Sequence, residues 1–276
     1  MRYFSVLIFM VFFSFSQTKA LKGYVYYSHY ENLFVGKKGG TEIRGNLIFD
    51  SSSSYFYTGR DSLNFEFDKQ IEQSIKSSEN LNDENVIFYS DGYDGSIADV
   101  DYFRVQTTAD SVFAYYNRYS AKNYYLHFIK EAKPVINWKL EDETKKIGSF
   151  ECSKAVCNFR GREYTAWYTT RIPLPFGPWK FQGLPGLILE VYNKNQDIYF
   201  SAKKILIPID PAVKVPLIIK PKNVEWMLSV KELLVRQDEN LQDEFEKGVL
   251  AVAGLKDFKG KIYKGSLEKN FMEIEE

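Results

Sequence analysis

Residues 181–192 read Phe-Gln-Gly-Leu-Pro-Gly-Leu-Ile-Leu-Glu-Val-Tyr and predict a tight turn that leads directly into a β-strand. Pro185 suits the second position of a β-turn, and Gly186 suits the third position, where a type II turn needs a positive φ. The residues that follow alternate between two faces, with Leu187, Leu189 and Val191 on one and Ile188, Glu190 and Tyr192 on the other. We therefore expect a strand that lies inside the hydrophobic interior.

Similar short alternating runs recur along the chain between turn residues. They cover residues 23–30, 42–49, 54–57, 86–89, 102–107, 112–116, 124–128, 137–140, 150–159, 163–169 and 198–207. Arg160-Gly161-Arg162 predicts the turn of a hairpin, and the charged residues 141–144 predict a polar turn. Three prolines within residues 173–178 predict an extended connector, because proline is excluded from a central strand and from a helix interior.

One helix is well indicated, over residues 223–248, with Asn223 as its cap and Gly248 at its end. A second, short helix is permitted within residues 61–83. Consecutive hairpins without strand–helix alternation favour antiparallel pairing. The predicted fold is mainly β (α+β), an antiparallel sheet or an open barrel or bowl of sequential hairpins with one or two helices.

The N-terminus is typical of an export signal. A short positive start at Met1-Arg2 precedes an apolar run and then small residues, and cleavage after Ser16 or after Ala20 is feasible. We expect a signal peptide over residues 1–20 and a single β-rich domain over residues 21–276, in the periplasm or secreted. The alternative is a retained membrane anchor, although the apolar run is shorter than the roughly 20 residues that a spanning helix needs.

The charge balance bears on the kind of partner, and the cysteine spacing bears on disulfide formation. The 36 basic and 36 acidic residues balance to a formal net charge of +0, with no basic stripe that would favour nucleic acid. Cys152 and Cys157 are five residues apart, so a straight strand places them on opposite faces and about 17 Å apart along the chain. Two separate thiols are favoured over a disulfide, which would require a turn between them.

No motif for a familiar enzyme class is present in the sequence. A nucleophilic Ser or Cys needs a base, and the two histidines, His29 and His127, lie in tyrosine-rich strands that favour a packing role. The serine run 51–54 predicts a hairpin loop rather than a nucleophile. The aspartates of residues 91–101 predict an acidic turn rather than a calcium site. We expect no cofactor and no metal, and whether the chain is an enzyme stays open, with a non-catalytic role favoured.

A cluster of basic and aromatic residues is the candidate binding surface. Aromatic faces stack on sugars or apolar side chains, and Arg binds carboxylates through two contacts. The candidates are Arg160, Arg162, Tyr164, Trp167, Tyr168, Trp179 and Lys180. The alternative interpretation is structural, since strand alternation sends about half of residues 164–168 into the core.

The segment 138–205 resembles the GLPGLI family, whose members are exported proteins typical of Bacteroidetes. The family motif stands intact as Gly183-Leu184-Pro185-Gly186-Leu187-Ile188, and residues 146–181 also follow the family pattern in order. Cys152 occupies a usual family position, whereas Cys157 does not. The family has no known activity. The resemblance implies a β-rich accessory fold of the kind found in the non-catalytic, bowl-shaped N-terminal module of a bacterial peptide-N-glycosidase.

These observations predict an exported cell-envelope protein that binds a peptide, a glycan or a partner protein without catalysis. One alternative is a hydrolase that acts on peptide or glycan through carboxylates, for which two carboxyl groups must flank the bond that is cleaved. Another alternative is a structural or assembly component of the envelope. We expect no transmembrane span in the mature chain.

Overall fold

The computed structural model describes residues 21–31, 42–58, 73, 86–89, 102–120, 123–220 and 222. Each element whose bounds it gives is a strand: β1 (Gly23–Glu31), β2 (Glu42–Phe49), β3 (Ser54–Thr58), β4 (Val86–Tyr89), β5 (Tyr102–Thr107), β6 (Ser111–Ser120), β7 (Asn123–Ala132), β8 (Lys139–Ile147), β9 (Phe150–Phe159), β10 (Arg162–Thr169), β11 (Leu187–Asn193) and β12 (Ile198–Leu206). The predicted signal peptide, the short helix and the helix over 223–248 lie outside the described residues.

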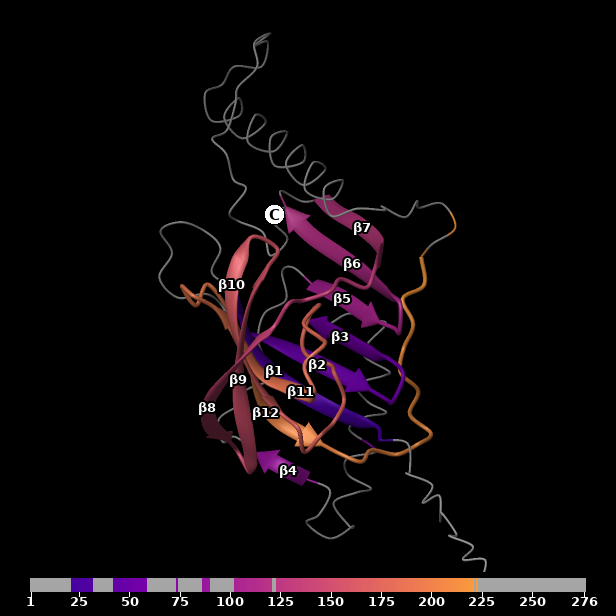
Figure 1. Ribbon diagram of the computed structural model, residues 1–276. Helices are drawn as coiled ribbons and strands as arrows, with labels where there is room; N and C mark the ends of the chain where they lie inside the picture. Colours follow the sequence, from indigo (N-terminus) through magenta and orange to yellow (C-terminus); the bar gives the residue numbers. More distant parts are fainter. Residues whose placement is uncertain are drawn as a thin grey trace, which may run out of the picture.

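The strands form one antiparallel open sheet (Figure 1). Its order is β7-β6-β5-β3-β2-β1-β12-β11-β10-β9-β8. The last strand, β12, lies beside the first, β1, and so joins an N-terminal half (β1–β3 and β5–β7) to a C-terminal half (β8–β12). The opposite side of β12 is shared, because β11 pairs near Ser201 and β4 pairs near Ile205. The prediction of a mainly β, antiparallel fold is confirmed.

The predicted polar turn at 141–144 is wrong, because β8 runs straight through it. This strand is the last in the sheet order, and its ladder to β9 shifts register between Glu141 and Thr144. Lys154 on β9 lies 3.0 Å from Glu141 and 2.7 Å from Glu143. Charged side chains and an irregular register are common on edge strands, where they discourage pairing with another chain. The charges therefore mark a sheet edge and not a turn.

The hairpin between β9 and β10 is confirmed. Phe159 pairs with Arg162, which leaves a loop of two residues. Both loop residues have positive φ, 48° at Arg160 and 70° at Gly161. A two-residue loop with this backbone is a type I′ turn, whose twist matches that of the flanking strands.

The predicted role of Gly186 in a type II turn is wrong, since the positive φ lies at Gly183, at 93°. A Cβ at Gly186 would stand 2.1 Å from the carbonyl oxygen of Thr169, so this glycine serves a close approach of two backbones. The strand that follows is as predicted, with Leu187 and Leu189 fully buried. Ile188 is also fully buried, because its side chain lies against Gly177 of the connector and packs in the same core cluster.

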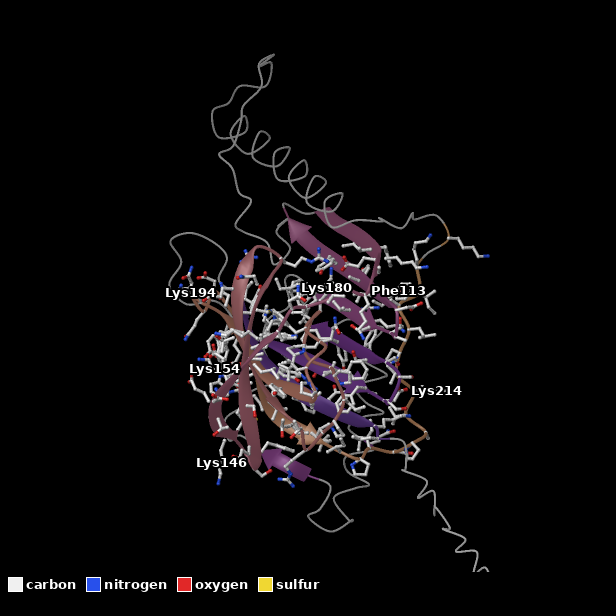
Figure 2. All side chains as sticks on the ribbon, in the orientation of Figure 1. Phe113, Lys146, Lys154, Lys180, Lys194 and Lys214 are labelled. Atoms are coloured by element: carbon white, nitrogen blue, oxygen red, sulfur yellow. The ribbon has the colours of Figure 1, made fainter. Side chains whose placement is uncertain are left out.

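The sheet bends around the connector 170–186, which fills its inner face. Trp179 and Phe181 of the connector pack in one core cluster with inward side chains from both halves, such as Tyr27 of β1 and Tyr164 of β10. The Tyr27 hydroxyl donates to the Ile188 carbonyl at 2.6 Å. Figure 2 places Lys180 between the two halves. The inner face is therefore a packed interior.

The outer face of the N-terminal half is covered by a strap, residues 207–220, which follows β12 along the sheet (Figure 1). Ile209 and Val213 pack there on Tyr24, Tyr55 and neighbouring residues of β1–β3. The Ile209 amide donates to the Lys22 carbonyl, and the Ile218 amide donates to Gln106 Oε1. Within the described residues, no helix is long and apolar enough to cross a membrane.

Candidate functional site

The structure separates the seven binding residues predicted from the sequence. Tyr164 and Lys180 are fully buried, and Trp179 is 1% exposed. Trp167 and Tyr168 are also buried, whereas Arg160 and Arg162 are partly exposed. They do not form one aromatic surface, because alternate residues of β10 point to opposite faces and the connector points inward.

Three of the charged groups on the inner face form an ion cluster (Glu131, Arg160 and Lys180). Glu131 on β7 lies 2.6 Å from Arg160 Nη2 and 2.7 Å from Lys180 Nζ. The cluster joins β7, the β9–β10 turn and the connector, which are far apart in the sequence. Burial acts to raise the pKa of Glu131, but the charges of Lys180 and Arg160 outweigh it and hold that pKa below its usual value.

The residues beside this cluster have packing partners of their own. The Trp179 indole donates to the Tyr116 hydroxyl at 3.1 Å, and its backbone has a positive φ of 51°. The Phe181 ring lies 4.7 Å from that of Tyr164, edge to face. The aromatic–basic pattern of residues 160–181 is thus largely that of a closed interior.

Three of the side chains considered for nucleophilic chemistry, those of His29, Cys152 and Cys157, are buried. Ser51 and Ser52 of the serine run are exposed, and the side chain of His127 lies outside what the structure describes. His29 is fully buried, its ring stacks on Phe200 at 4.1 Å, and burial lowers its pKa to about 3. Cys152 and Cys157 are buried, free thiols, as predicted. Burial raises the pKa of Cys152 to about 12, so its thiol stays protonated at neutral pH. Among the described residues, no three His, Cys, Asp or Glu side chains gather where they could hold a metal ion.

The outer face carries a different group of aromatic side chains, the tyrosine row (Tyr30, Tyr199 and Tyr192). These residues are cross-strand partners on β1, β12 and β11. Ring centroids are 6.4 Å apart between Tyr30 and Tyr199, and 5.7 Å apart between Tyr199 and Tyr192, which stack. All three are partly exposed. The row therefore presents aromatic surface across three central strands.

Two of these tyrosines have matching polar partners. Glu42 and Ser28 stand beside Tyr30 and act on its pKa, and Glu190 and Ser201 do the same for Tyr199. The Ser28 hydroxyl itself donates to Glu42 Oε1. The match follows from the register, which places Ser28 opposite Ser201 just as it places Tyr30 opposite Tyr199. Burial and Glu190 together raise the pKa of Tyr199 to about 12, and burial and Glu42 raise that of Tyr30. Both phenols stay protonated at neutral pH and available as donors.

Glu190 has a cation in contact with it, and Glu42 has one two residues away along β2. Lys145 Nζ lies 2.5 Å from Glu190 and 4.4 Å from the ring centre of Trp167, which is opposite Glu190 on β10. On the other side, Arg44 is two residues along β2 from Glu42 and stacks on Tyr26 at 4.4 Å. The described surroundings of the row are therefore close to neutral in charge. Of the seven predicted residues, Trp167 alone lies next to the polar neighbours of the tyrosine row, opposite Glu190 and under Lys145.

Sequence reasoning missed the row because its members come from strands that are distant along the chain. The available signal was weak: Tyr30 and Tyr192 each fall on a definite face of their own alternating strand. Only the pairing of β12 with both β1 and β11 brings those faces together.

One segment of the chain matches a family of known sequences. Residues 158–190 match the family described as "Protein of unknown function (Porph_ging)". The match runs from the end of β9 to β11 and lies within the segment that resembles the GLPGLI family. No curated protein matches the chain.

Two solved structures of PNGF-II, in the P21 and C2 crystal forms, are similar in outline. Their TM-scores are 0.43 and 0.45, at 13% and 15% sequence identity. The comparisons cover 78% and 77% of this chain, and 32% of PNGF-II in each case. The chain thus spans about a third of PNGF-II, and at these scores the likeness carries no argument about function.

Proposed function

We propose that the chain is an exported cell-envelope protein of the GLPGLI family that binds a ligand, without catalysis, on the outer face of its sheet. The observation that supports this most is the tyrosine row: three partly exposed rings in register on adjacent strands, with a carboxylate and a serine at each of two hydroxyls. Exposed aromatic residues combined with a few placed polar groups are typical of binding surfaces.

The rigidity of this position favours recognition. β1, β12 and β11 lie in the middle of the sheet, and the inward faces of the same strands are fully buried at Tyr27, Phe200 and Val191. Sites built on packed strands hold their side chains in place more accurately than sites on loops. A ligand therefore meets a surface that is already organised.

Retention on the envelope tests this proposal. The mature protein is mixed with washed envelope from the source organism, and the bound fraction is measured after sedimentation. We expect retention by the native protein and its loss in a Tyr192→Ala/Tyr199→Ala double variant. Phe113→Ala is the matched control, because Phe113 is a partly exposed aromatic residue of β6, outside the row. Equal retention of all three proteins would contradict a binding role for the row.

Export is tested separately, by the N-terminal sequence of the protein recovered from periplasm and medium. The expected first residue is Gln17 or Leu21, from cleavage after Ser16 or Ala20. Recovery of the protein only in the cytoplasmic membrane, with residue 1 still present, would instead support a retained anchor.

The hydrolase alternative has one observation in its favour, which is that two carboxylates, Glu42 and Glu190, stand beside the same row. A glycosidase needs one carboxyl group that is protonated and able to act as an acid. Glu190 is instead paired with Lys145 at 2.5 Å and is 9% exposed, so it has little access to a glycosidic oxygen outside the sheet. Release of reducing ends or of amines from envelope material, abolished in Glu42→Gln, would establish catalysis in place of binding alone.

A further inference from the structure

We propose that the ligand of the tyrosine row is a neutral glycan, bound with its sugar rings against the tyrosines and its hydroxyls on the phenols and on Glu42. This inference rests on the proposed function, since it names the chemical class of ligand for the same surface. Three features of the described residues carry it: the chemistry of the polar groups, the state of the backbone and the local charge.

The polar groups beside the row suit hydroxyls. Glu42 is partly exposed and accepts hydrogen bonds, while the partly exposed phenols both donate and accept. Ser28, Ser201 and Glu190 are buried behind them, at 1%, 8% and 9% exposure, and support the row from within. Sugars combine this need for mixed donors and acceptors with apolar C–H faces that pack on aromatic rings. The ring separations of 5.7 and 6.4 Å place successive tyrosines within reach of neighbouring units of one oligosaccharide.

The backbone around the row is unavailable to an extended peptide. At Tyr199 and Ser201, β12 is paired with β1 on one side and with β11 on the other. Strand addition, the usual way in which a sheet binds an extended peptide, needs unpaired backbone groups at an edge. A peptide at the row would have to bind through side-chain contacts alone, without backbone hydrogen bonds. A glycan has no strand to add and can bind through side-chain contacts only.

The charge near the row argues against a charged polysaccharide. Glu190 is paired with Lys145, and Glu42 lies on the same strand as Arg44, two residues away. An anionic polymer would meet two carboxylates, and a cationic one would have to compete with both cations. A neutral glycan avoids either repulsion.

Binding measurements on the full mature chain test the inference. The probes are laminarin and yeast mannan as neutral glycans, polygalacturonate as an anionic one, and reduced, carboxymethylated lactalbumin as an unfolded polypeptide. Calorimetry or affinity electrophoresis gives the dissociation constants for the native protein, Tyr199→Ala, Tyr192→Ala and the Phe113→Ala control. Thermal melting of each variant verifies that it is folded, and Glu42→Gln replaces any tyrosine variant that is not.

We expect binding of at least one neutral glycan, weakened about tenfold by loss of one ring and unchanged in Phe113→Ala. Tyr199→Phe should retain more affinity than Tyr199→Ala, because it keeps the ring. Row-dependent binding of lactalbumin or polygalacturonate without either neutral glycan would overturn the inference and leave the proposed function intact. Failure to bind any probe would also overturn the glycan inference. Glycan binding that is insensitive to every variant of the row would overturn both.

Discussion

The ion cluster on the inner face and the tyrosine row on the outer face each combine charged and aromatic neighbours, yet they differ in exposure and in origin. The inner group draws Lys180 and Arg160 from a basic–aromatic segment that stands out in the sequence, and the structure buries most of that segment. The outer group draws single tyrosines from three separate strands and leaves them partly exposed. In this chain, the segment that is richest in basic and aromatic residues is mostly packed inside the protein. The partly exposed tyrosine row arises instead from the register between strands.

The sharpest test of this contrast is the carboxylate of Glu131. Glu131→Ala leaves two cations at an interior site without their anion, and removal of one partner of a buried ion pair costs about 3–5 kcal/mol. Chemical denaturation measures the loss. Glu163→Ala is the control, because its pair with Lys194 is exposed and 3.9 Å long, and we expect a change within about 1 kcal/mol. Equal effects of the two substitutions would mean that the ion cluster does not join the halves of the sheet.

The two glycines of the segment 183–188 provide a second test. Gly186→Val should lower the free energy of unfolding by about 1–3 kcal/mol, because a side chain at this position meets the Thr169 carbonyl. Gly183→Ala should cost about 1–3 kcal/mol through its positive φ, although there is space for the Cβ, whose nearest neighbour is 4.0 Å away. Substitution of each glycine by Ala and by Val distinguishes the steric cause at Gly186 from the backbone cause at Gly183. Gly186 should become worse with side-chain size, whereas Gly183 should already lose most of its stability with Ala.

The third test concerns pH and the inner face. The pKa of His29 is about 3 in the folded protein, against about 6.5 for an unfolded chain. The unfolded state therefore binds more protons as the pH falls below 6.5, and stability falls with it. The loss amounts to about 2 kcal/mol at pH 5. Glu131 adds little between pH 8 and pH 5, because its pKa is lowered from the ordinary carboxyl value, which already lies below this range of pH.

Denaturation curves at pH 8 and pH 5 measure the effect of His29, and His29→Phe is the matched variant. Phe has a similar shape and can stack on Phe200, but it does not titrate. Its stability should change less between the two pH values than that of the native protein. An unchanged pH dependence would show that His29 is not held neutral in the core.

The smallest effect on stability is expected at the tyrosine row. Tyr30→Phe and Tyr199→Phe remove hydroxyls that are partly exposed, so each should change the free energy of unfolding by about 1 kcal/mol or less. Thermal melting checks this directly. A much larger loss would place the row with the ion cluster, as a structural feature, and would remove the basis for a binding surface.

Much of the strand pattern was predictable, because alternation along a strand is a local property. β2, β4, β5 and β9 have the predicted bounds, and β6 and β7 are longer than predicted. The error at residues 141–144 came from reading charge as a turn, where the structure has an edge strand. The error at Gly186 came from assigning a φ requirement where the requirement is space.

The sequence by itself determined a β-rich chain, the hairpin at Arg160-Gly161, two separate thiols and a strand at Leu187 that enters the core. These follow from short-range rules: side-chain alternation, turn chemistry and residue spacing. Only the tertiary structure decided that β12 returns beside β1, that Lys180 is buried against Glu131, and that Tyr30, Tyr199 and Tyr192 share one face. The physical reason is that register between strands depends on the packing of the whole sheet, and no local pattern specifies which distant strand becomes a neighbour.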